Sequence, residues 1–222
     1  MELNLGTEPR NEYLSFELMK GALKLVRDVM LIKETSSDSR VIKAVAQAAY
    51  SIGAIPTVIE YATAANACME PAAPIAAAVA KADVWIEFTY AYIMHSEAFR
   101  NSMAYGTRYI CLTGMDVEMM VKTIARVDYE AMINLGEYIK DKLEKADEIV
   151  IKSKNGTSLT AYNQGRKVRH AGQKATKKGY PIMLGGQISW CPMESTINGT
   201  LVFDGALFPP LELGKLSAPV KL

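Results

Sequence analysis

The fold is decided by the stretch from Asp83 to Leu112, whose sequence is DVWIEFTYAYIMHSEAFRNSMAYGTRYICL. Its two ends, Asp83–Phe88 and Tyr109–Leu112, are short and mainly apolar, which is typical of parallel strands buried on both faces. Between them we predict a helix over His95–Tyr105 that ends at Gly106. A strand, a helix and a second strand joined by short connections indicate one unit of a parallel α/β sheet.

The same alternation of strands and helices surrounds this stretch. Some segments repeat apolar residues at helical spacing, and others are short apolar runs. The predicted elements are a helix over Glu12–Leu25, a strand over Val29–Ile32, a helix over Arg40–Ser51, a strand over Pro56–Tyr61, a helix over Ile75–Ala82 and, after the stretch, a helix over Tyr129–Lys145. We therefore predict an α/β fold, with a parallel sheet that carries helices on both faces.

The pattern changes towards the carboxyl end of the sequence. Two segments of strand character, Glu148–Lys152 and Thr157–Tyr162, flank Asn155-Gly156, which is a strong signal for a hairpin. Glycine-rich segments with little helical character follow. The predicted division is an α/β domain over residues 1–146 and a smaller β-rich segment over residues 147–222, which is either a small second domain or an incomplete one.

Composition excludes several classes of function. Twenty-five basic residues balance 24 acidic ones, so the net charge of +1 gives no support for a nucleic-acid or anionic-membrane partner. The three cysteines are far apart, which favours free thiols in a reducing compartment. The first residues lack the pattern of a signal peptide, and no apolar run approaches the roughly 20 residues that span a bilayer. We expect a soluble, cytoplasmic protein.

The two histidines are the first candidates for chemistry, because ligands of parallel α/β sheets bind beyond the carboxyl ends of the strands. His95 follows the third predicted strand and lies near the start of a helix, which disfavours imidazolium, so a neutral imidazole there could polarise or orient an anionic substrate. The alternative is a capping or interface histidine. His170 lies in the basic run Arg166–His170, which could equally be a solvated charged turn.

The segment Gly185–Ser195 is the second candidate, because paired glycines allow close approach of the backbone to another group. Its alternative is a tight edge strand. No metal-binding spacing of histidines, phosphate-binding loop or catalytic triad is recognisable. Glu194 and Asp204 could be ligands, but they could equally be structural caps in turn-rich β structure.

Taken together, several short motifs resemble one family in both type and order. They are Glu70-Pro71, Ala82–Ile86, His95, Gly106–Arg108, Val127–Tyr129, Gly156–Leu159, Gly165-Arg166, Gly185–Glu194 and Asn198–Gly205. The sequence resembles the amino-terminal two-thirds of the leucyl aminopeptidase T-like and 2,5-dihydroxypyridine 5,6-dioxygenase family. The resemblance implies an α/β domain, a second domain with most of the metal ligands, and a homodimer or larger oligomer.

The resemblance also carries expectations for the site. Peptidases of this family bind two metal ions, whereas its dioxygenases hold one Fe(II) through two histidines and an aspartate in a carboxyl-terminal stretch that this sequence lacks. The peptidases carry a glutamate ligand where this chain has Gln187, and a neutral amide is a weaker ligand, which favours the dioxygenase-like interpretation. His95 and His170 would then orient substrate or move protons, with His95, Gln187, Ser189 and Glu194 as substrate-binding residues.

Three interpretations follow from these expectations. In the first, the chain is part or a subunit of a metal-dependent enzyme, dioxygenase-like or aminopeptidase-like, that acts on a small aromatic or heterocyclic acid. We expect no metal on this chain alone, and Fe(II) or another divalent metal in the complete assembly, held by a second chain or a missing segment. In the second, the chain binds a small molecule without catalysis. In the third, it is a structural subunit of a hetero-oligomer.

Overall fold

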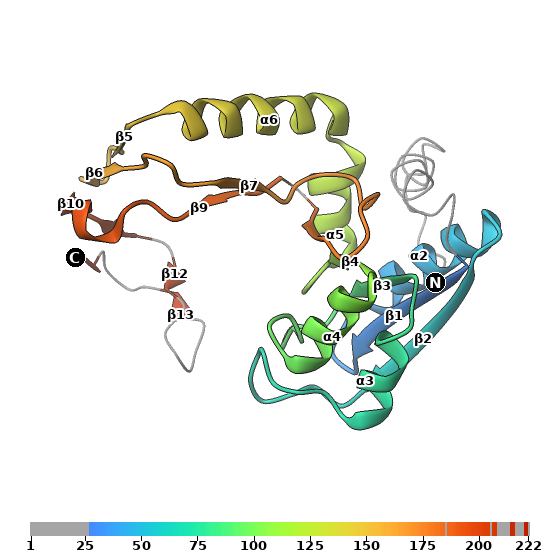
Figure 1. The fold of residues 1–222 in the computed structure, drawn as a ribbon. Coiled ribbons are helices and arrows are strands. Elements are labelled where there is room, and N and C mark those ends of the chain that lie inside the picture. Colours follow the sequence, from blue (N-terminus) through green and yellow to red (C-terminus); the bar gives the residue numbers. More distant parts are fainter. Residues whose placement is uncertain (1–26, 185, 205, 208–213, 216–219, 222) are drawn as a thin grey trace. The chain divides into compact units, whose positions relative to one another are not determined.

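The computed structural model describes residues 27–184, 186–204, 206–207, 214–215 and 220–221 (Figure 1). The helix predicted over Glu12–Leu25 lies outside these residues. The chain forms two compact units, each made of two segments. Unit 1 contains the residues up to Ile133 together with Ala171–Gln187, and unit 2 contains Asn134–His170 together with the residues from Ile188 onwards.

Unit 1 is built on a five-stranded sheet with the order β2-β1-β3-β4-β8, and every neighbouring pair is parallel. Its strands are β1 (Asp28–Glu34), β2 (Ile55–Tyr61), β3 (Val84–Glu87), β4 (Arg108–Cys111) and β8 (Pro181–Met183). Every residue of β3 and β4 is buried, as expected for central strands covered on both faces. The predicted parallel sheet is confirmed.

The helices of the α/β pattern cover both faces of this sheet. They are α2 (Ser39–Ser51), α3 (Ala73–Val79), α4 (Glu97–Tyr105) and α5 (Val117–Met120), which continues into the π-helix η1 (Val121–Ala125). On one face, Val45 of α2 packs into a core with Leu31 and Ile86. On the other, Val79 of α3 belongs to a core with Trp85. Because successive strand residues point to opposite faces, β1, β3, β4 and β8 each contribute to both cores. The edge strand β2 contributes to the second core alone, through Ile59 and Tyr61.

The predicted helix over His95–Tyr105 begins two residues later in the structure. Ser96 is the cap residue, and its side chain accepts a hydrogen bond from the Phe99 amide. His95 has a φ of 77°, which lies in the left-handed region and cannot continue into a helix. Gly106 ends the helix with a φ of 104°, as its sequence position predicts.

The fifth strand of the parallel sheet comes from a later part of the sequence. β8 pairs with β4 through Tyr109↔Pro181, Ile110↔Ile182 and Cys111↔Met183. Sequence reasoning did not find this strand, because three residues are too short for a periodicity to appear. β8 lies within residues 147–222, the range predicted as the β-rich segment. The predicted domain boundary at residue 146 stays a prediction.

Unit 2 contains small antiparallel sheets. β5 (Glu148–Lys152) and β6 (Ser158–Tyr162) form the predicted hairpin, and β10 (Asn198–Thr200) pairs with β6. The other pairs are β7 (Val168–His170) with β9 (Ile188–Trp190), β11 (Val202–Phe203) with β14 (Val220–Lys221), and β12 (Ala206–Leu207) with β13 (Gly214–Lys215). A 3₁₀ turn, η2, spans Glu194–Thr196. The predicted smaller β-rich segment is confirmed, and its sheets are antiparallel.

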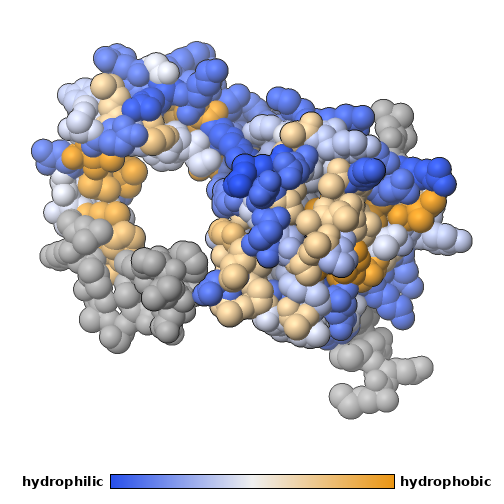
Figure 2. Space-filling model, turned by 60° about the horizontal axis from the view of Figure 1, so that its bottom comes forward, coloured by the Kyte–Doolittle hydropathy of each residue, from blue (hydrophilic) through white to orange (hydrophobic). Residues whose placement is uncertain are grey.

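The helix α6 (Tyr129–Lys145) contains the point where the chain passes from unit 1 to unit 2. The bounds of this helix are those predicted from the sequence. Hydrophilic and hydrophobic side chains share the surface, as Figure 2 shows, and in unit 2 the exposed apolar residues include Val150, Ile151 and Ile197. None of the described helices is both long enough and apolar enough to cross a membrane.

Candidate functional site

Two glutamates lie at the carboxyl edge of the parallel sheet, where α/β proteins place their ligands. Glu34 ends β1 and Glu87 ends β3, on neighbouring strands. Both side chains are 0% exposed. A buried carboxylate is costly unless hydrogen bonds replace its lost hydration, so the partners of each one define what it does.

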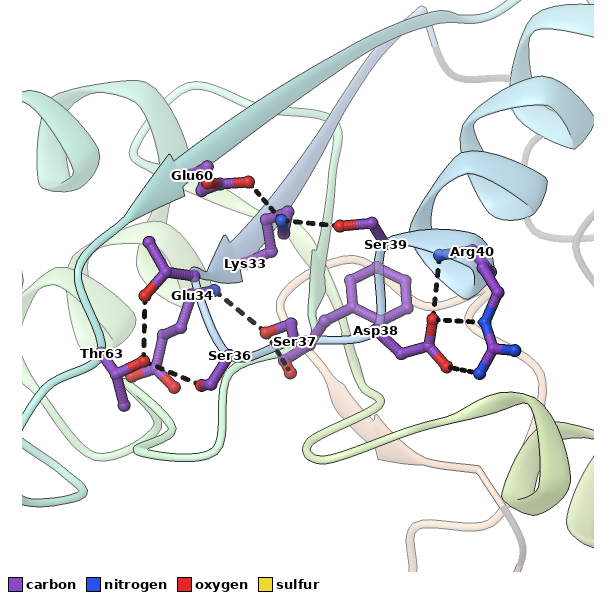
Figure 3. A network of polar contacts seen from close by, with 11 residues as sticks. Lys33, Glu34, Ser36, Ser37, Asp38, Ser39, Arg40, Glu60 and Thr63 are labelled. Carbon is purple, nitrogen blue, oxygen red and sulfur yellow. Dashed lines mark hydrogen bonds and ion pairs between the residues drawn. The ribbon is translucent and has the colours of Figure 1, made fainter.

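Glu34 accepts hydrogen bonds from the backbone of two loops. One carboxylate oxygen accepts from the Ala64 amide at 3.1 Å, in the loop after β2. The other accepts from the amides of Tyr90 and Ala91 at 2.9 and 3.4 Å, in the loop after β3. The backbone amide of Glu34 itself donates to the Ser37 hydroxyl at 3.0 Å (Figure 3). Glu34 therefore ties three loops of this edge together.

Glu87 has a different set of partners. Its carboxylate accepts hydrogen bonds from the hydroxyls of Thr89 and Tyr109 and from the backbone amide of Ile93. Burial raises the pKa of Glu87, and the hydrogen bonds from Tyr109, Ile93 and Thr89 oppose that rise. Burial likewise raises the pKa of Tyr109, and the nearby carboxylate of Glu87 adds to the effect.

A polar network continues from Glu34 along the loop between β1 and α2 (Figure 3). The hydroxyls of Ser36 and Thr63 lie 2.8 Å apart, and both residues are exposed. Next to them, the buried ammonium group of Lys33 pairs with Glu60 and donates to the Ser39 hydroxyl at 3.1 Å. This edge of unit 1 thus presents exposed hydroxyl groups near a carboxylate that accepts three hydrogen bonds.

His95 is exposed and lies beside this edge, just before α4. Its ring makes an edge contact with Phe99, and its carbonyl accepts a hydrogen bond from Arg100 at 2.8 Å. The helix terminus is already occupied, because the Glu70 carboxylate accepts from the amides of Glu97 and Ala98 at 2.8 and 2.9 Å. An anionic substrate beside His95 would therefore meet the imidazole, because the first amides of the helix are already bonded to Glu70.

His170 is 2% exposed, so the interpretation of this residue as part of a solvated turn is wrong. It lies in β7, and its Nδ1 atom is 3.0 Å from an Oε atom of Glu137 in α6. The ring packs directly against Gly136, where an added Cβ atom would come within 2.3 Å of it. Alternation along the strand explains the difference, because Val168 and His170 point inwards while Arg169 points to solvent.

Gln187 is exposed and belongs to unit 1. Its carbonyl accepts a hydrogen bond from the Ala171 amide at 2.9 Å. The preceding Gly186 has a φ of 84°. It lies so close to Gly172 that a Cβ atom added to Gly172 would come within 2.4 Å of the Cα atom of Gly186. The expected close approach of backbone at this glycine is therefore present, and its partner is another glycine of the same unit.

Ser189 and Glu194 belong to unit 2. Ser189 lies opposite Arg169 in the β7–β9 ladder and lines a groove of about 370 Å³. The rest of that lining is mainly apolar and includes Ile149, Ile151, Leu159, Ile188 and Trp190. Glu194 is exposed and forms an ion pair with Arg166 at 2.8 Å.

The local surroundings of Glu194 also affect its acidity. Its pKa is lowered, first by a hydrogen bond from its own backbone amide and then by the Cys191 thiol and Arg166. The Cys191 thiol donates to the carboxylate at 3.2 Å, and that bond raises the pKa of Cys191. Glu194 is therefore a paired surface carboxylate.

The predicted site residues divide between the two units. His95 and Gln187 lie in unit 1, whereas His170, Ser189 and Glu194 lie in unit 2, where the β7–β9 ladder places His170 and Ser189 in adjacent pairs. Sequence reasoning missed Glu34 and Glu87. Their signal was a glutamate at the end of a mainly apolar run, as in Met30–Glu34 and Val84–Glu87.

The described residues do not fit a metal centre by themselves. In that part of the chain no three histidine, cysteine, aspartate or glutamate side chains come together in a way that could hold a metal ion. The carboxylates of Glu34 and Glu87 are bonded to amide and hydroxyl donors, which orient their oxygen atoms towards the protein. No step of the chemistry is therefore assigned to a metal held by these residues.

The family model of 2,5-dihydroxypyridine 5,6-dioxygenase matches residues 12–208. No curated protein matches this sequence. Among solved structures, the 2,5-dihydroxypyridine dioxygenase of Pseudomonas putida KT2440 is similar with a TM-score of 0.70 and 18% identity, over 95% of this chain and 65% of that one. Wild-type AmpT from Thermus thermophilus is similar with a TM-score of 0.59 and 14% identity, over 90% of this chain and 66% of that one.

At these identities the likeness to the two structures shows the fold alone. This chain spans only 65% and 66% of their lengths. The resemblance to the dioxygenases and to their aminopeptidase T-like relatives, expected from the order of the motifs, is confirmed. Since the family model covers most of the sequence, the chain belongs to the 2,5-dihydroxypyridine 5,6-dioxygenase family.

Proposed function

We propose that this chain is part of a metal-dependent, dioxygenase-like enzyme that acts on a small aromatic or heterocyclic acid. The observation that carries the proposal is the family match over residues 12–208. The metal, Fe(II) or another divalent ion, would be held by a second chain or by a segment beyond this sequence. Such an assembly would be a homo- or hetero-oligomer, and a cytoplasmic location is part of the same proposal.

His95 is the residue that we propose to contact the substrate. It is exposed at the carboxyl edge of the sheet, where the alternative of a helix cap is taken by Ser96 and Glu70. An exposed imidazole accepts one hydrogen bond and donates another when neutral, and donates from both ring nitrogens when protonated. Its role would be to orient an acidic substrate or to exchange a proton with it.

For His170 we propose a role in proton movement through its partner. The His170 ring is buried, while the side chain of Glu137 is 44% exposed, so a proton could pass between solvent and the imidazole through this carboxylate. A histidine with a carboxylate at hydrogen-bond distance has a fixed ring orientation, which general acid–base chemistry requires. Its role stays separate from metal binding.

The groove of unit 2 supports Ser189 as a proposed substrate-binding residue, whereas Glu194 does not line it and is proposed from the family resemblance alone. Small-molecule sites are concave, mainly apolar and carry a few polar groups that fix orientation. The groove has mainly apolar walls, including Trp190, and its lining also contains the hydroxyl residues Ser189 and Thr160, a combination suited to an aromatic ring with a polar substituent. Gln187 is proposed as a substrate contact on unit 1, where its exposed amide can both donate and accept.

The test is to isolate the tagged chain from its native host with whatever accompanies it. Mass and metal content are measured together, followed by ring-opening assays on 2,5-dihydroxypyridine. A stoichiometric second polypeptide with iron and activity is the expected result. Zinc, manganese or cobalt together with peptide hydrolysis would instead support the aminopeptidase-like alternative. A lone homo-oligomer without metal or activity would overturn the proposal in favour of a binding or structural subunit.

His95 is tested in the same assembly with His95→Asn. Asparagine tolerates the left-handed backbone at this position, so the variant removes the imidazole without adding backbone strain. The expected effect is a loss of activity by about 10²-fold or more, the usual contribution of a general acid or base. Arg100→Lys, which changes the group beside His95 but keeps the ring, serves as the matched control.

A further inference from the structure

The loop between β3 and α4 carries His95, and it has no strand or helix of its own. Residues 88–95 nevertheless have a defined course, because buried groups bind their backbone. The Glu34 carboxylate accepts from the amides of Tyr90 and Ala91. The Glu87 carboxylate accepts from the amide of Ile93.

Further bonds connect this loop to its surroundings. Glu87 also accepts from the hydroxyl of Thr89 at 2.7 Å, so it binds the loop at two points. The carbonyl of Tyr92 accepts from the amide of Cys68 at 2.7 Å, and Cys68 belongs to the loop after β2. Because Glu34 also binds Ala64 of that second loop, both loops share one fixed arrangement.

Stability of the sheet does not by itself require two carboxylates at these positions. Buried charged groups can often be replaced by well-packed apolar residues of similar volume without loss of stability. What an apolar residue cannot provide is an acceptor for several loop amides at once. The specific effect of Glu34 and Glu87 is therefore on the conformation of the loop.

We infer that Glu34 and Glu87 are positioning residues, which hold residues 88–95 in the conformation that presents His95 to the substrate. The inference rests on the substrate contact proposed for His95. Neither glutamate touches the substrate in this arrangement. They act through the loop, which ends in the left-handed backbone of His95 with a φ of 77°.

The first test measures amide hydrogen exchange in the full chain. In the wild type, the amides of Tyr90, Ala91 and Ile93 should be protected although they lie in a loop. Glu34→Gln keeps one acceptor oxygen and turns an amide NH₂ towards the donors on the other side, so exchange should rise by about tenfold or more either at Tyr90 and Ala91 or at Ala64. Unprotected amides at these positions in the wild type would overturn the inference.

The matched variants separate the two carboxylates. Glu87→Gln should affect Ile93 more than Tyr90, and Thr89→Val should give a weaker effect in the same region, since it removes only one donor to Glu87. Glu60→Gln is the control, because Glu60 is a half-exposed carboxylate at the same end of the sheet that pairs with Lys33. Thr89→Val and the wild-type protection pattern keep the test decisive if either glutamine variant fails to fold.

The second test distinguishes positioning from simple loss of stability. Glu34→Gln should lower activity of the isolated assembly about tenfold, and it should have no further effect in the His95→Asn background, since residues that act as one unit are not additive. The ring resonances of His95 should shift in Glu34→Gln and stay unchanged in Glu60→Gln. Additive losses, or unchanged ring resonances, would overturn the inference.

The inference and the proposed function can fail separately. If His95→Asn keeps full activity in the assembly, the substrate role of His95 is wrong, whatever the exchange pattern shows. If His95→Asn abolishes activity but Glu34→Gln leaves both the loop amides and the activity unchanged, the substrate role stands and the positioning role is wrong.

Discussion

At the scale of single residues, the Glu87 carboxylate combines burial with hydrogen bonds from Thr89, Ile93 and Tyr109. Burial is the largest influence and raises the pKa of Glu87 above its ordinary value of 4.5. The folded protein therefore binds this proton up to a higher pH than the unfolded chain does. The contribution of Glu87 to the free energy of unfolding therefore falls as the pH rises from about 4.5 to the raised pKa, and it is constant above that pKa.

Replacement of this carboxylate gives a prediction for the pH dependence. Glu87→Gln removes the titrating group, so the stability of the wild type relative to this variant should decrease as the pH rises from about 4 upwards. Urea unfolding at a series of pH values measures it. Parallel curves for the wild type and Glu87→Gln would contradict the raised pKa.

His95 shows why residue type and position alone do not define a site. Its place near a helix start was visible in the sequence, and the structure confirms that position. That the helix amides bind Glu70 instead of a ligand depends on a loop 27 positions earlier in the chain. No local pattern contains this information, because the partner is brought in by the fold.

At the scale of elements, the contact between α6 and β7 depends on the absence of a side chain at Gly136. Alanine is normally favoured over glycine inside a helix by about 0.5–1 kcal/mol. Here its Cβ atom would lie 2.3 Å from the His170 ring. The local propensity and the tertiary packing therefore have opposite effects at this position.

We expect Gly136→Ala to destabilise the protein by about 1–3 kcal/mol, because overpacking forces the ring or the helix to move. Thermal or urea unfolding measures the change. In a His170→Ala background the same substitution should become neutral or stabilising, since the clash is gone. Destabilisation of equal size in both backgrounds would show that the His170 ring is not the cause.

The start of α2 allows a second prediction at this scale. Asp38 accepts a hydrogen bond from the Arg40 amide and forms an ion pair with the Arg40 side chain. Asp38→Ala should lower the free energy of unfolding by about 1 kcal/mol, whereas Arg40→Ala should cost less, because it keeps the backbone bond and removes only an exposed ion pair. Equal costs for both variants would mean that the cap contributes little.

The pKa of the capping residue Asp38 is lowered. The side-chain hydrogen bond from Arg40 is the largest cause that lowers the pKa of Asp38. The folded state therefore favours the ionised carboxylate, so its contribution is present above the ordinary pKa and is lost as the pH falls through the lowered one. The difference between the wild type and Asp38→Ala should shrink on acidification below about pH 4.

At the scale of the whole molecule, the described residues do not assemble a metal centre, while the chain belongs to a dioxygenase family and spans about two thirds of two structural relatives. Metal chemistry would then depend on groups outside the described residues. The parallel sheet, in contrast, is complete enough to bury two hydrophobic cores within unit 1.

We therefore predict that removal of the metal from the isolated assembly leaves the fold of this chain unchanged. Under the proposed function, a strong chelator should abolish ring opening of 2,5-dihydroxypyridine, while amide protection in β1, β3 and β4 stays the same. Activity should return when Fe(II) is added back. Loss of protection in these strands on chelation would show that the metal contributes to the folding of this chain, as structural metals do.

The alternation of strands and helices was predictable because it depends on local patterns. The apolar runs of β1, β3 and β4 and the glycine at the end of α4 are signals within a few residues. β8 and the π-helix η1 were not predicted, since a three-residue strand has no period and a π-helix depends on its packing environment.

The sequence by itself determined that this protein has a parallel α/β sheet followed by small antiparallel strands, and which family it resembles. These properties follow from side-chain periodicity, turn residues and motif order, all of which are local or linear. Only the tertiary structure decided that Glu34 and Glu87 bind the loop of His95, and that His170 is buried against Gly136. The physical reason is that hydrogen bonds and steric contacts between distant segments exist only once the chain has folded.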